Sequence, residues 1–274
     1  MATVQYLKKK LKSVRSTQKV SKAMKTASTV KYSKISAMFS GFSLYEQACD
    51  LVYAQNKAQY DKLLAPTNKE APEAVIVIAG NKGMCAGFNS ELLSFAEEII
   101  GKAQKPPIIF ACGAKAKAFF EEKGIAVRKN YVFSDLPQYG EVLELKSDIE
   151  KCISDAEVSS VKIVFQKYSH MMKQTPSVCD LFEGSENEQA SCDALFVPDR
   201  ESFVSNTLDK ILGARLYKKV LETALGAQAA TLMTMRSAYD TATELTQELE
   251  GEINRKRQSQ VTADVLETAA EFKQ

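Results

Sequence analysis

The segment Gly80–Gly87 is the first place in this sequence where residue types and spacing could do chemistry. It reads Gly-Asn-Lys-Gly-Met-Cys-Ala-Gly between an apolar run and a helical one, where phosphate-binding loops occur. The glycine spacing fits neither the dinucleotide fingerprint G-x-G-x-x-G nor the P-loop G-x-x-x-x-G-K-[ST]. We interpret the segment as a tight structural turn, with a nucleotide site as the minor alternative.

Other candidates for catalysis are few. His170 is the only histidine, so acid–base or metal chemistry centred on histidine is nearly excluded. The acidic pairs Glu97–Glu98 and Glu121–Glu122 fall beside lysines on expected helices, which favours solvated faces over an acid–base dyad. The six cysteines form no C-x-x-C pair, which favours reduced thiols over a metal cluster or a disulfide framework. The sequence therefore predicts no catalytic residue, no cofactor and no metal.

A polar cluster near the end of the chain is better suited to binding another protein. Residues Asn254–Thr262 combine arginine and glutamine side chains, which can make several directional hydrogen bonds to carboxylates or backbone groups. An ordinary exposed helix face is the alternative interpretation.

The elements that position these residues begin with a basic segment. The first acidic residue is Glu46, and the 45 residues before it hold ten lysines or arginines and no proline. Such a helix lacks the opposite-charge pairs that stabilise helix surfaces, so its carboxylate partners must come from another molecule or be replaced by water. The pattern predicts one helix from about Thr3 to Leu64. Its apolar stripe should include Val4, Leu7, Leu11, Val14, Val20, Met24, Ala27, Val30 and Ile35.

The middle of the chain alternates short apolar runs with helical stretches, which predicts a parallel, doubly wound sheet. The expected strand and helix pairs are Val75–Ala79 with Asn89–Ile100, Pro107–Cys112 with Ala114–Lys123, and Ile125–Phe133 with Val142–Ile153. Further strands are expected at Val161–Tyr168, Ser177–Phe182 and Ala194–Val197, the first two pairing antiparallel.

The segment after Pro198 predicts a second long helix. Its apolar residues from Leu225 to Ile253 recur on average every 3.5 residues, the coiled-coil period. Continued to Phe272, the helix would be roughly 100 Å long at 1.5 Å per residue, too long for the middle domain to cover. We therefore predict an α/β fold in which long N- and C-terminal helices form an antiparallel coiled coil around an inserted doubly wound, Rossmann-like domain. The expected segments are 1–65, 70–200 and 203–274; separate packing of each helix on a partner or in a bundle is the alternative.

The sequence resembles a known family, the gamma subunits of F-type ATP synthases, over essentially its whole length. Residues Leu11–Met24 are similar to the family's opening pattern of basic residues, Thr-Gln-Lys and Lys-Ala/Ser-Met. Residues Lys82–Asn89 resemble its Arg-Gly-Leu-Cys-Gly-Gly-x-Asn stretch, with Lys, Met and Ala substituted. Residues Asn254–Thr262 match its Asn-Lys-x-Arg-Gln-x-x-Ile-Thr segment.

The chain also departs from the family pattern. Residues Ala227–Leu232 stand where Glu-x-Ala-Ala-Arg-Met is usual, so Ala227 replaces an acid and Thr231 replaces an arginine. Thr241 stands where asparagine is usual, and Glu271–Phe272 stands where Gly-Ala is typical. These changes affect contacts between the shaft and its partners and leave the expected fold intact.

The resemblance implies a non-catalytic rotor shaft. The coiled coil would thread a ring of alpha and beta subunits, and the α/β domain would rest on the membrane c-ring and the epsilon (delta-type) subunit. Arg257, Gln258 and Thr262 match positions that engage a loop of the beta subunit, and Met24, with Lys22 and Lys25, matches a position near beta's acidic loop. No nucleic acid is expected as a partner.

The implied location is peripheral to a membrane, on the cytoplasmic face of a bacterial plasma membrane, with the mitochondrial matrix face less favoured. No apolar run reaches the roughly 20 residues that would cross a bilayer, and the basic N-terminus is interpreted as mature protein rather than a transit peptide. Two other classes stay open from the residues alone: a basic coiled coil that binds nucleic acid, and a nucleotide-binding α/β enzyme with helical extensions.

Overall fold

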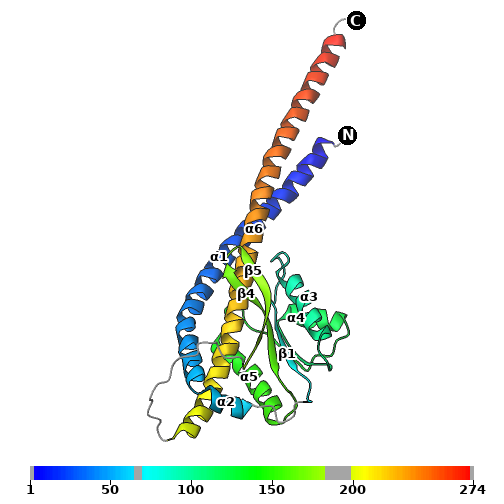
Figure 1. Ribbon diagram of the computed structural model, residues 1–274. Coiled ribbons are helices and arrows are strands. Elements are labelled where there is room, and N and C mark those ends of the chain that lie inside the picture. The colour runs from blue at the N-terminus through cyan, green and yellow to red at the C-terminus, as the bar shows by residue number, and fades with distance from the viewer. Residues whose placement is uncertain (1–2, 65–69, 183–198, 272–274) are drawn as a thin grey trace. The chain divides into compact units, whose positions relative to one another are not determined.

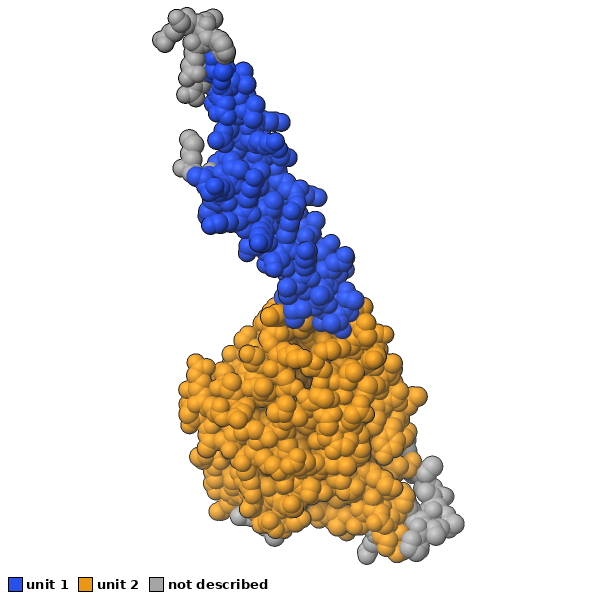
Figure 2. Space-filling view, turned by 180° about the vertical axis from the view of Figure 1, so that it is seen from behind, with its two compact units in different colours: residues 1–28, 232–274 blue, residues 29–231 orange. Residues whose placement is uncertain are grey.

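The computed structural model describes residues 3–64, 70–182 and 199–271. The strand expected at Ala194–Val197 lies outside these ranges, as does Cys192. Backbone contacts divide the chain into two compact units: unit 1 comprises residues 1–28 and 232–274, and unit 2 comprises residues 29–231 (Figure 2). Each of the two long helices contributes residues to both units. The predicted division into three consecutive segments stays a prediction.

The N-terminal helical segment is two helices, not one. α1 runs from Val4 to Gln55 and α2 from Lys57 to Leu64. The break is at Asn56, whose side-chain amide donates to the carbonyl of Val52 at 3.1 Å. An asparagine that bonds the preceding turn competes with the helical ladder, which explains why the helix ends there although no proline or glycine is present.

The buried stripe of α1 differs from the expected one. Val20 and Val30 are 55% and 51% exposed, whereas Ser21 and Ser28 are only 4% and 6% exposed. Leu7, Ser21, Ser28 and Ile35 are all buried at heptad spacing, so the coiled-coil period continues through residues that are not apolar. Small serines allow the neighbouring backbone to approach closely, and the valines are left on the outer surface.

The sheet in unit 2 has five strands in the order β3-β2-β1-β4-β5. Four strands are parallel: β1 (Ala74–Ile78), β2 (Ile108–Cys112), β3 (Lys129–Tyr131) and β4 (Val161–His170). The fifth, β5 (Lys173–Asp180), pairs antiparallel with β4, as predicted, but begins earlier than Ser177. The expected strand at Ile125–Phe133 shortens to three residues at the sheet edge.

Helices cover both faces of this sheet (Figure 1). Alternate β1 residues point to opposite faces: Val75 and Val77 pack with α3 (Phe88–Gly101) and α4 (Ala114–Glu122). Ile76 and Ile78 pack in the other core, which includes residues of α5 (Tyr139–Ser154) and of the unit 2 parts of α1 and α6. The doubly wound prediction is therefore confirmed, with the chain's own terminal helices completing the second face.

α6 is one continuous helix of 72 residues, Arg200–Glu271. It continues through Gly213, Gly226 and Gly251, which are weaker helix breakers than proline. Its predicted seam is largely buried, including Leu225, Ala229, Met235, Ala242 and Leu249. The predicted long C-terminal helix is thus confirmed.

The turn after β1 contains a strained residue that gives a testable prediction. Ala86 has a φ of 50°, a left-handed conformation that costs a residue with a Cβ atom roughly 1–2 kcal/mol. We expect Ala86→Gly to increase the free energy of unfolding by about 0.5–1 kcal/mol, measured by urea denaturation. The matched control is Ala118→Gly on the exposed surface of α4, which should decrease that free energy by about 1 kcal/mol. Equal effects of the two substitutions would contradict the assignment of strain.

Candidate functional site

The glycine-containing turn after β1 is held by side-chain hydrogen bonds from within unit 2. Asn89 Oδ1 accepts the N–H of Gly80 at 2.9 Å, and Asn89 Nδ2 donates to the carbonyl of Lys82 at 3.1 Å. Asn89 is buried at the start of α3. One buried amide thus determines the shape of the turn.

The N-terminus of α4 is occupied by the same turn. Asn81 Oδ1 accepts the N–H of Ala114 at 3.0 Å, and the carbonyl of Gly80 accepts the N–H of Lys115 at 3.2 Å. A phosphate bound at this helix end would compete with both acceptors, because the N–H groups it needs are already donated. The geometry supports the structural turn over the phosphate-loop alternative.

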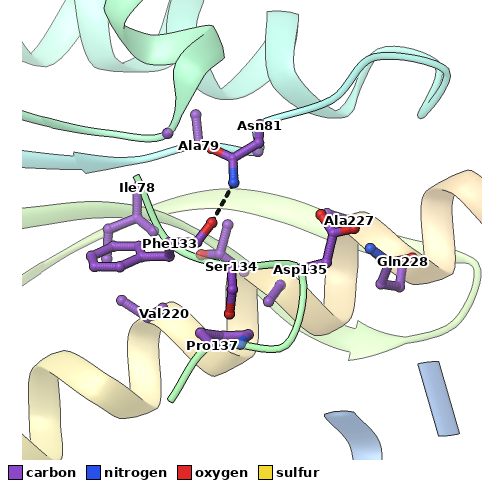
Figure 3. Close-up of a pocket in the computed structure, with 14 residues that line it drawn as sticks. Ile78, Ala79, Asn81, Phe133, Ser134, Asp135, Pro137, Val220, Ala227 and Gln228 are labelled. Carbon is purple, nitrogen blue, oxygen red and sulfur yellow. Dashed lines mark hydrogen bonds between the residues drawn. The ribbon is translucent and has the colours of Figure 1, made fainter. Parts of the chain in front are cut away.

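A small cavity lies at the carboxyl ends of β1 and β2, against α6 (Figure 3). Its volume is about 60 Å³, and its lining includes Asn81, Asp135, Thr223 and Ala227. Thr223 is 2% exposed, and its Oγ1 makes no hydrogen bond with the described residues. A cavity of this size holds a few water molecules, whereas cofactor pockets are typically about 300–1,000 Å³. Within the described part of the chain, no nucleotide-sized cavity lies at this sheet edge.

Asp135, at the rim of this cavity, pairs with two lysines. Its Oδ2 lies 2.5 Å from Nζ of Lys31 on α1 and 2.6 Å from Nζ of Lys82 in the turn after β1. The hydrogen bond from Lys31 has the larger effect and that from Lys82 the second largest; both stabilise the carboxylate and lower the pKa of Asp135 below its usual value. The carboxylate joins α1 to the turn after β1.

This pairing predicts a dependence of stability on pH. Because the folded-state pKa of Asp135 is lowered, its contribution is fully present above the unfolded-state pKa of about 3.9 and is lost as the pH falls through the folded-state value. We expect Asp135→Asn to lower the free energy of unfolding at neutral pH, and this difference should shrink steadily in acid. Urea denaturation across the acid range measures it. In a Lys31→Met/Lys82→Met background, the effect of Asp135→Asn on the free energy of unfolding should no longer depend on pH. If the pH dependence persists there, these lysines are not its cause.

In unit 1, α1 and α6 are paired antiparallel. Arg15 forms an ion pair with Glu250, Gln18 Nε2 donates to Thr243 Oγ1 at 2.8 Å, and Lys25 Nζ lies 4.5 Å from the ring centroid of Tyr239. Residue numbers rise on one helix as they fall on the other, which confirms the predicted coiled coil. The prediction that partners or water replace the missing carboxylates is partly wrong, because Glu250 and Asp135 of the same chain supply two of them.

The predicted partner-binding residues lie in two places within unit 1. Arg257, Gln258 and Thr262 are exposed, and the Thr262 hydroxyl donates to the Gln258 carbonyl at 2.9 Å. The last turns of α6 extend beyond the start of α1 (Figure 1).

The second place is on α1, where Lys22 is exposed, Met24 is half-buried, and Lys25 lies beside Tyr239. Tyr239 precedes Arg257 by 18 residues on α6, which corresponds to about 27 Å along the helix. The structure therefore does not bring the two sets together; they form separate patches. Of the divergent positions, Ala227 lines the cavity, Thr231 donates to the Ala227 carbonyl at 2.8 Å, and Thr241 is exposed.

Sequence reasoning missed a buried charged contact between α1 and α6 in unit 2. Arg215 of α6 pairs with Asp50 of α1 at 2.9 Å, and Lys218 pairs with Glu46 at 3.4 Å. The signal was present: Glu46 and Asp50 are the first two acidic residues of the chain and lie four apart on one helix face. The first acidic residues of α1 therefore lie where this helix contacts the basic residues Arg215 and Lys218 of α6.

The histidine and the described cysteines, also considered for chemistry, take part in a turn or are free thiols. His170 Nδ1 accepts the N–H of Met172 at 3.3 Å in the turn between β4 and β5. The five described cysteines are free thiols, and burial raises the pKa of each. Within the described ranges, no group of three or more His, Cys, Asp or Glu side chains could hold a metal ion. No helix among the described residues is long and apolar enough to span a membrane.

Comparison with known proteins identifies the family. A model of the family described as ATP synthase matches residues 3–271. The ATP synthase gamma chain of Pelotomaculum thermopropionicum is 25% identical over 275 residues, covering 97% of each chain. That of Actinobacillus succinogenes is 26% identical and covers 98% of each.

Solved structures are similar in fold. A chain in the Euglena gracilis mitochondrial ATP synthase (OSCP/F1/c-ring) has a TM-score of 0.66 at 16% identity, covering 98% of this chain and 93% of that one. A chain in the rotor of the same enzyme has a TM-score of 0.62 at 16% identity, covering 94% of this chain and 98% of that one. The family match spans both units and all three motifs that carry the resemblance. The chain therefore belongs to the ATP synthase family and aligns from end to end with its gamma chains.

Proposed function

We propose that this chain is the central-stalk shaft that transmits rotation between a membrane ion-driven rotor ring and the alpha and beta catalytic subunits. It would serve ATP synthesis or ATP-driven ion pumping. The observation that carries the proposal is unit 1, in which α1 and α6 pair antiparallel and the last turns of α6 continue past α1 with exposed polar side chains. The full-length match to gamma chains supports it.

The chain itself would be non-catalytic. A shaft built from two different helices presents a different surface in each direction, so its rotation changes which catalytic subunit meets which side chains. Each subunit would then shift between conformations of different nucleotide affinity, which is a coupling free energy between distant sites. This role requires rigid helices and specific contacts, and it requires no cofactor, metal or nucleophile in the chain.

Two contacts with the beta subunit are proposed. Arg257, Gln258 and Thr262 would bind a beta-subunit loop, since their side chains are exposed near the end of α6. Met24, with Lys22 and Lys25, would face an acidic loop of the same subunit. Both contacts rest on the family motifs and on the exposure of Arg257 and Lys22, whose charged groups are well suited to charge-assisted hydrogen bonds.

Unit 2 would contact the epsilon (delta-type) subunit and the membrane c-ring. Support comes from the Euglena structure with OSCP, F1 and c-ring, and from the Tetrahymena thermophila central stalk and c-ring. The chain would then be a peripheral membrane protein, on the cytoplasmic face of a bacterial plasma membrane. A nucleic-acid-binding role and a nucleotide-binding enzyme find no support in the family match.

A native pull-down tests the proposal. The tagged full-length chain should bring down two nucleotide-binding subunits of about twice its mass, each in roughly threefold excess, as expected for one shaft in a ring with three-fold repetition. Nucleotide titration of the isolated chain should detect no tight stoichiometric site. Recovery of nucleic acid, or of no such subunits from membranes that contain the chain, would contradict the assignment.

A further inference from the structure

Three side chains of α6 in unit 2 bond directly to backbone groups outside the helix. Arg215 Nη1 donates to the carbonyl of Leu181 at 2.9 Å, just after β5. The Tyr217 hydroxyl donates to the carbonyl of Pro137 at 3.0 Å, and Glu222 Oε1 accepts the N–H of Tyr168 in β4 at 3.1 Å. Tyr168 lies within β4 and Leu181 directly follows β5, so the bonds of Glu222 and Arg215 restrain both rotation and sliding of α6 against the sheet.

Arg215 differs from the other two because it also bonds α1. Its Nε and Nη2 lie 3.1 and 2.9 Å from Asp50 Oδ1, and its guanidinium carbon lies 4.3 Å from the ring centroid of Tyr53. The hydroxyl of Tyr53 donates to the Phe182 carbonyl at 2.8 Å, beside the Leu181 carbonyl that Arg215 itself binds. A single side chain, 10% exposed, therefore joins α6, α1 and the end of β5.

Stability is a weak reason for such a contact. Replacing a buried ion pair by apolar residues of similar volume is often neutral or stabilising, because both charges must be desolvated. The hydrophobic effect that drives apolar burial is not directional. Hydrogen bonds weaken steeply as their angle departs from linear, so they restrain the rotation of a helix more sharply. The planar fork of arginine can bond a carboxylate and a carbonyl at the same time, which lysine cannot reproduce.

We propose that Arg215 is the positioning residue that locks both shaft helices to the sheet of unit 2, so that torque is transferred to the helices without slip. The inference rests on the proposed function. It adds a positioning residue in unit 2, apart from the predicted beta-subunit contacts in unit 1.

The chain offers a matched control. Lys218 and Glu46 form a second ion pair between α6 and α1, with side chains 10% and 19% exposed, and Lys218 also donates to the Ser43 hydroxyl of α1. No hydrogen bond from this pair to the sheet is present among the described residues. Removing it deletes a buried charge pair between the same two helices and leaves the bond to Leu181 in place.

The experiment uses the full chain assembled in its complex in membrane vesicles. Two readouts are compared at matched assembly: ATP hydrolysis without an ion gradient, and ATP-driven ion uptake. In the apolar variant Arg215→Met/Asp50→Leu, we expect the rate of ATP hydrolysis to stay within about twofold of wild type. The number of ions moved per ATP should fall by about fivefold or more, which is the lower end of the typical coupling factor between two sites. Arg215→Lys should be intermediate, and Lys218→Met/Glu46→Leu should keep the wild-type ratio.

The outcomes distinguish the proposed function of the chain from the role of Arg215. A wild-type complex that hydrolyses ATP without moving ions would overturn the proposed function. A coupled wild type with an apolar Arg215 variant that pumps at the wild-type ratio would overturn the role of Arg215, as would an equal loss in the Lys218 control. If the apolar variant fails to assemble, Arg215→Lys decides by the same ratio.

Discussion

Gly113→Ala is expected to destabilise unit 2 by about 4 kcal/mol or more, the exceptional end of single-substitution effects. Gly113 has a φ of 101°, and a Cβ atom at this position would lie 2.2 Å from the Ala79 carbonyl oxygen and 2.9 Å from its carbon. Both are backbone atoms at the end of β1, so no side-chain rotation can relieve the clash. With total stabilities of about 5–15 kcal/mol, a loss of this size removes a large share of the margin that keeps the sheet folded.

Gly124→Ala is the control for Gly113→Ala. Gly124 also has a positive φ, 68°, but a Cβ atom there would meet nothing within 4 Å. Its substitution should cost only the conformational term, about 1–2 kcal/mol. Urea denaturation followed by far-UV circular dichroism measures both variants; similar losses would show that the β1–β2 edge relaxes and that the contact with Ala79 is not decisive.

The double variant Arg257→Ala/Gln258→Ala is expected to lower ATP-driven ion pumping, or the yield of assembled complex, by about tenfold or more. Hydrogen bonds to charged groups contribute roughly 1.5–3 kcal/mol each, and 1.4 kcal/mol corresponds to a factor of ten. Both side chains are exposed on α6, so their loss should leave the folding of unit 2 unchanged. Pumping in inverted vesicles and the thermal midpoint of the isolated chain measure the two effects.

Ser259→Ala/Gln260→Ala provides the comparison for this variant. These residues follow directly on the same helix and are exposed, so they control for truncating two polar side chains. This control should pump at the wild-type rate. Assembly and wild-type pumping by the Arg257/Gln258 variant would show that the proposed beta-subunit contact is wrong.

Local pattern was sufficient for most of the fold. The 3.5-residue period predicted α6 and its seam, since a continuous helix needs only compatible residues and no breaker. Apolar runs bounded by turns predicted β1 and β2, because strands buried on both faces must be nearly all apolar. β4 was predicted from the apolar residues in its first half. The charge pattern held a further signal that sequence reasoning missed: the first acids of the chain, Glu46 and Asp50, mark where α1 meets Arg215 and Lys218.

The buried face of α1, the start of β5 and the break at Asn56 depend on which groups each residue contacts in the folded chain. Ser21 and Ser28 are buried while Val20 and Val30 are exposed, because position on the heptad, and not hydrophobicity, determines which side faces the seam. β5 begins at Lys173 because its backbone pairs with β4, although its side chains carry little apolar signal. The break at Asn56 likewise rests on a side-chain bond to Val52 that composition does not reveal.

Periodicity and residue identity along the chain predict the two long helices, the parallel sheet between them and the motifs that place the chain in its family. The bonds of Arg215 to α1 and to the end of β5, and the turn after β1 at the N-terminus of α4, are seen only in the folded chain. The reason is physical: a hydrogen bond or a buried ion pair requires two groups far apart in sequence to meet at about 3 Å, and no local pattern encodes that distance.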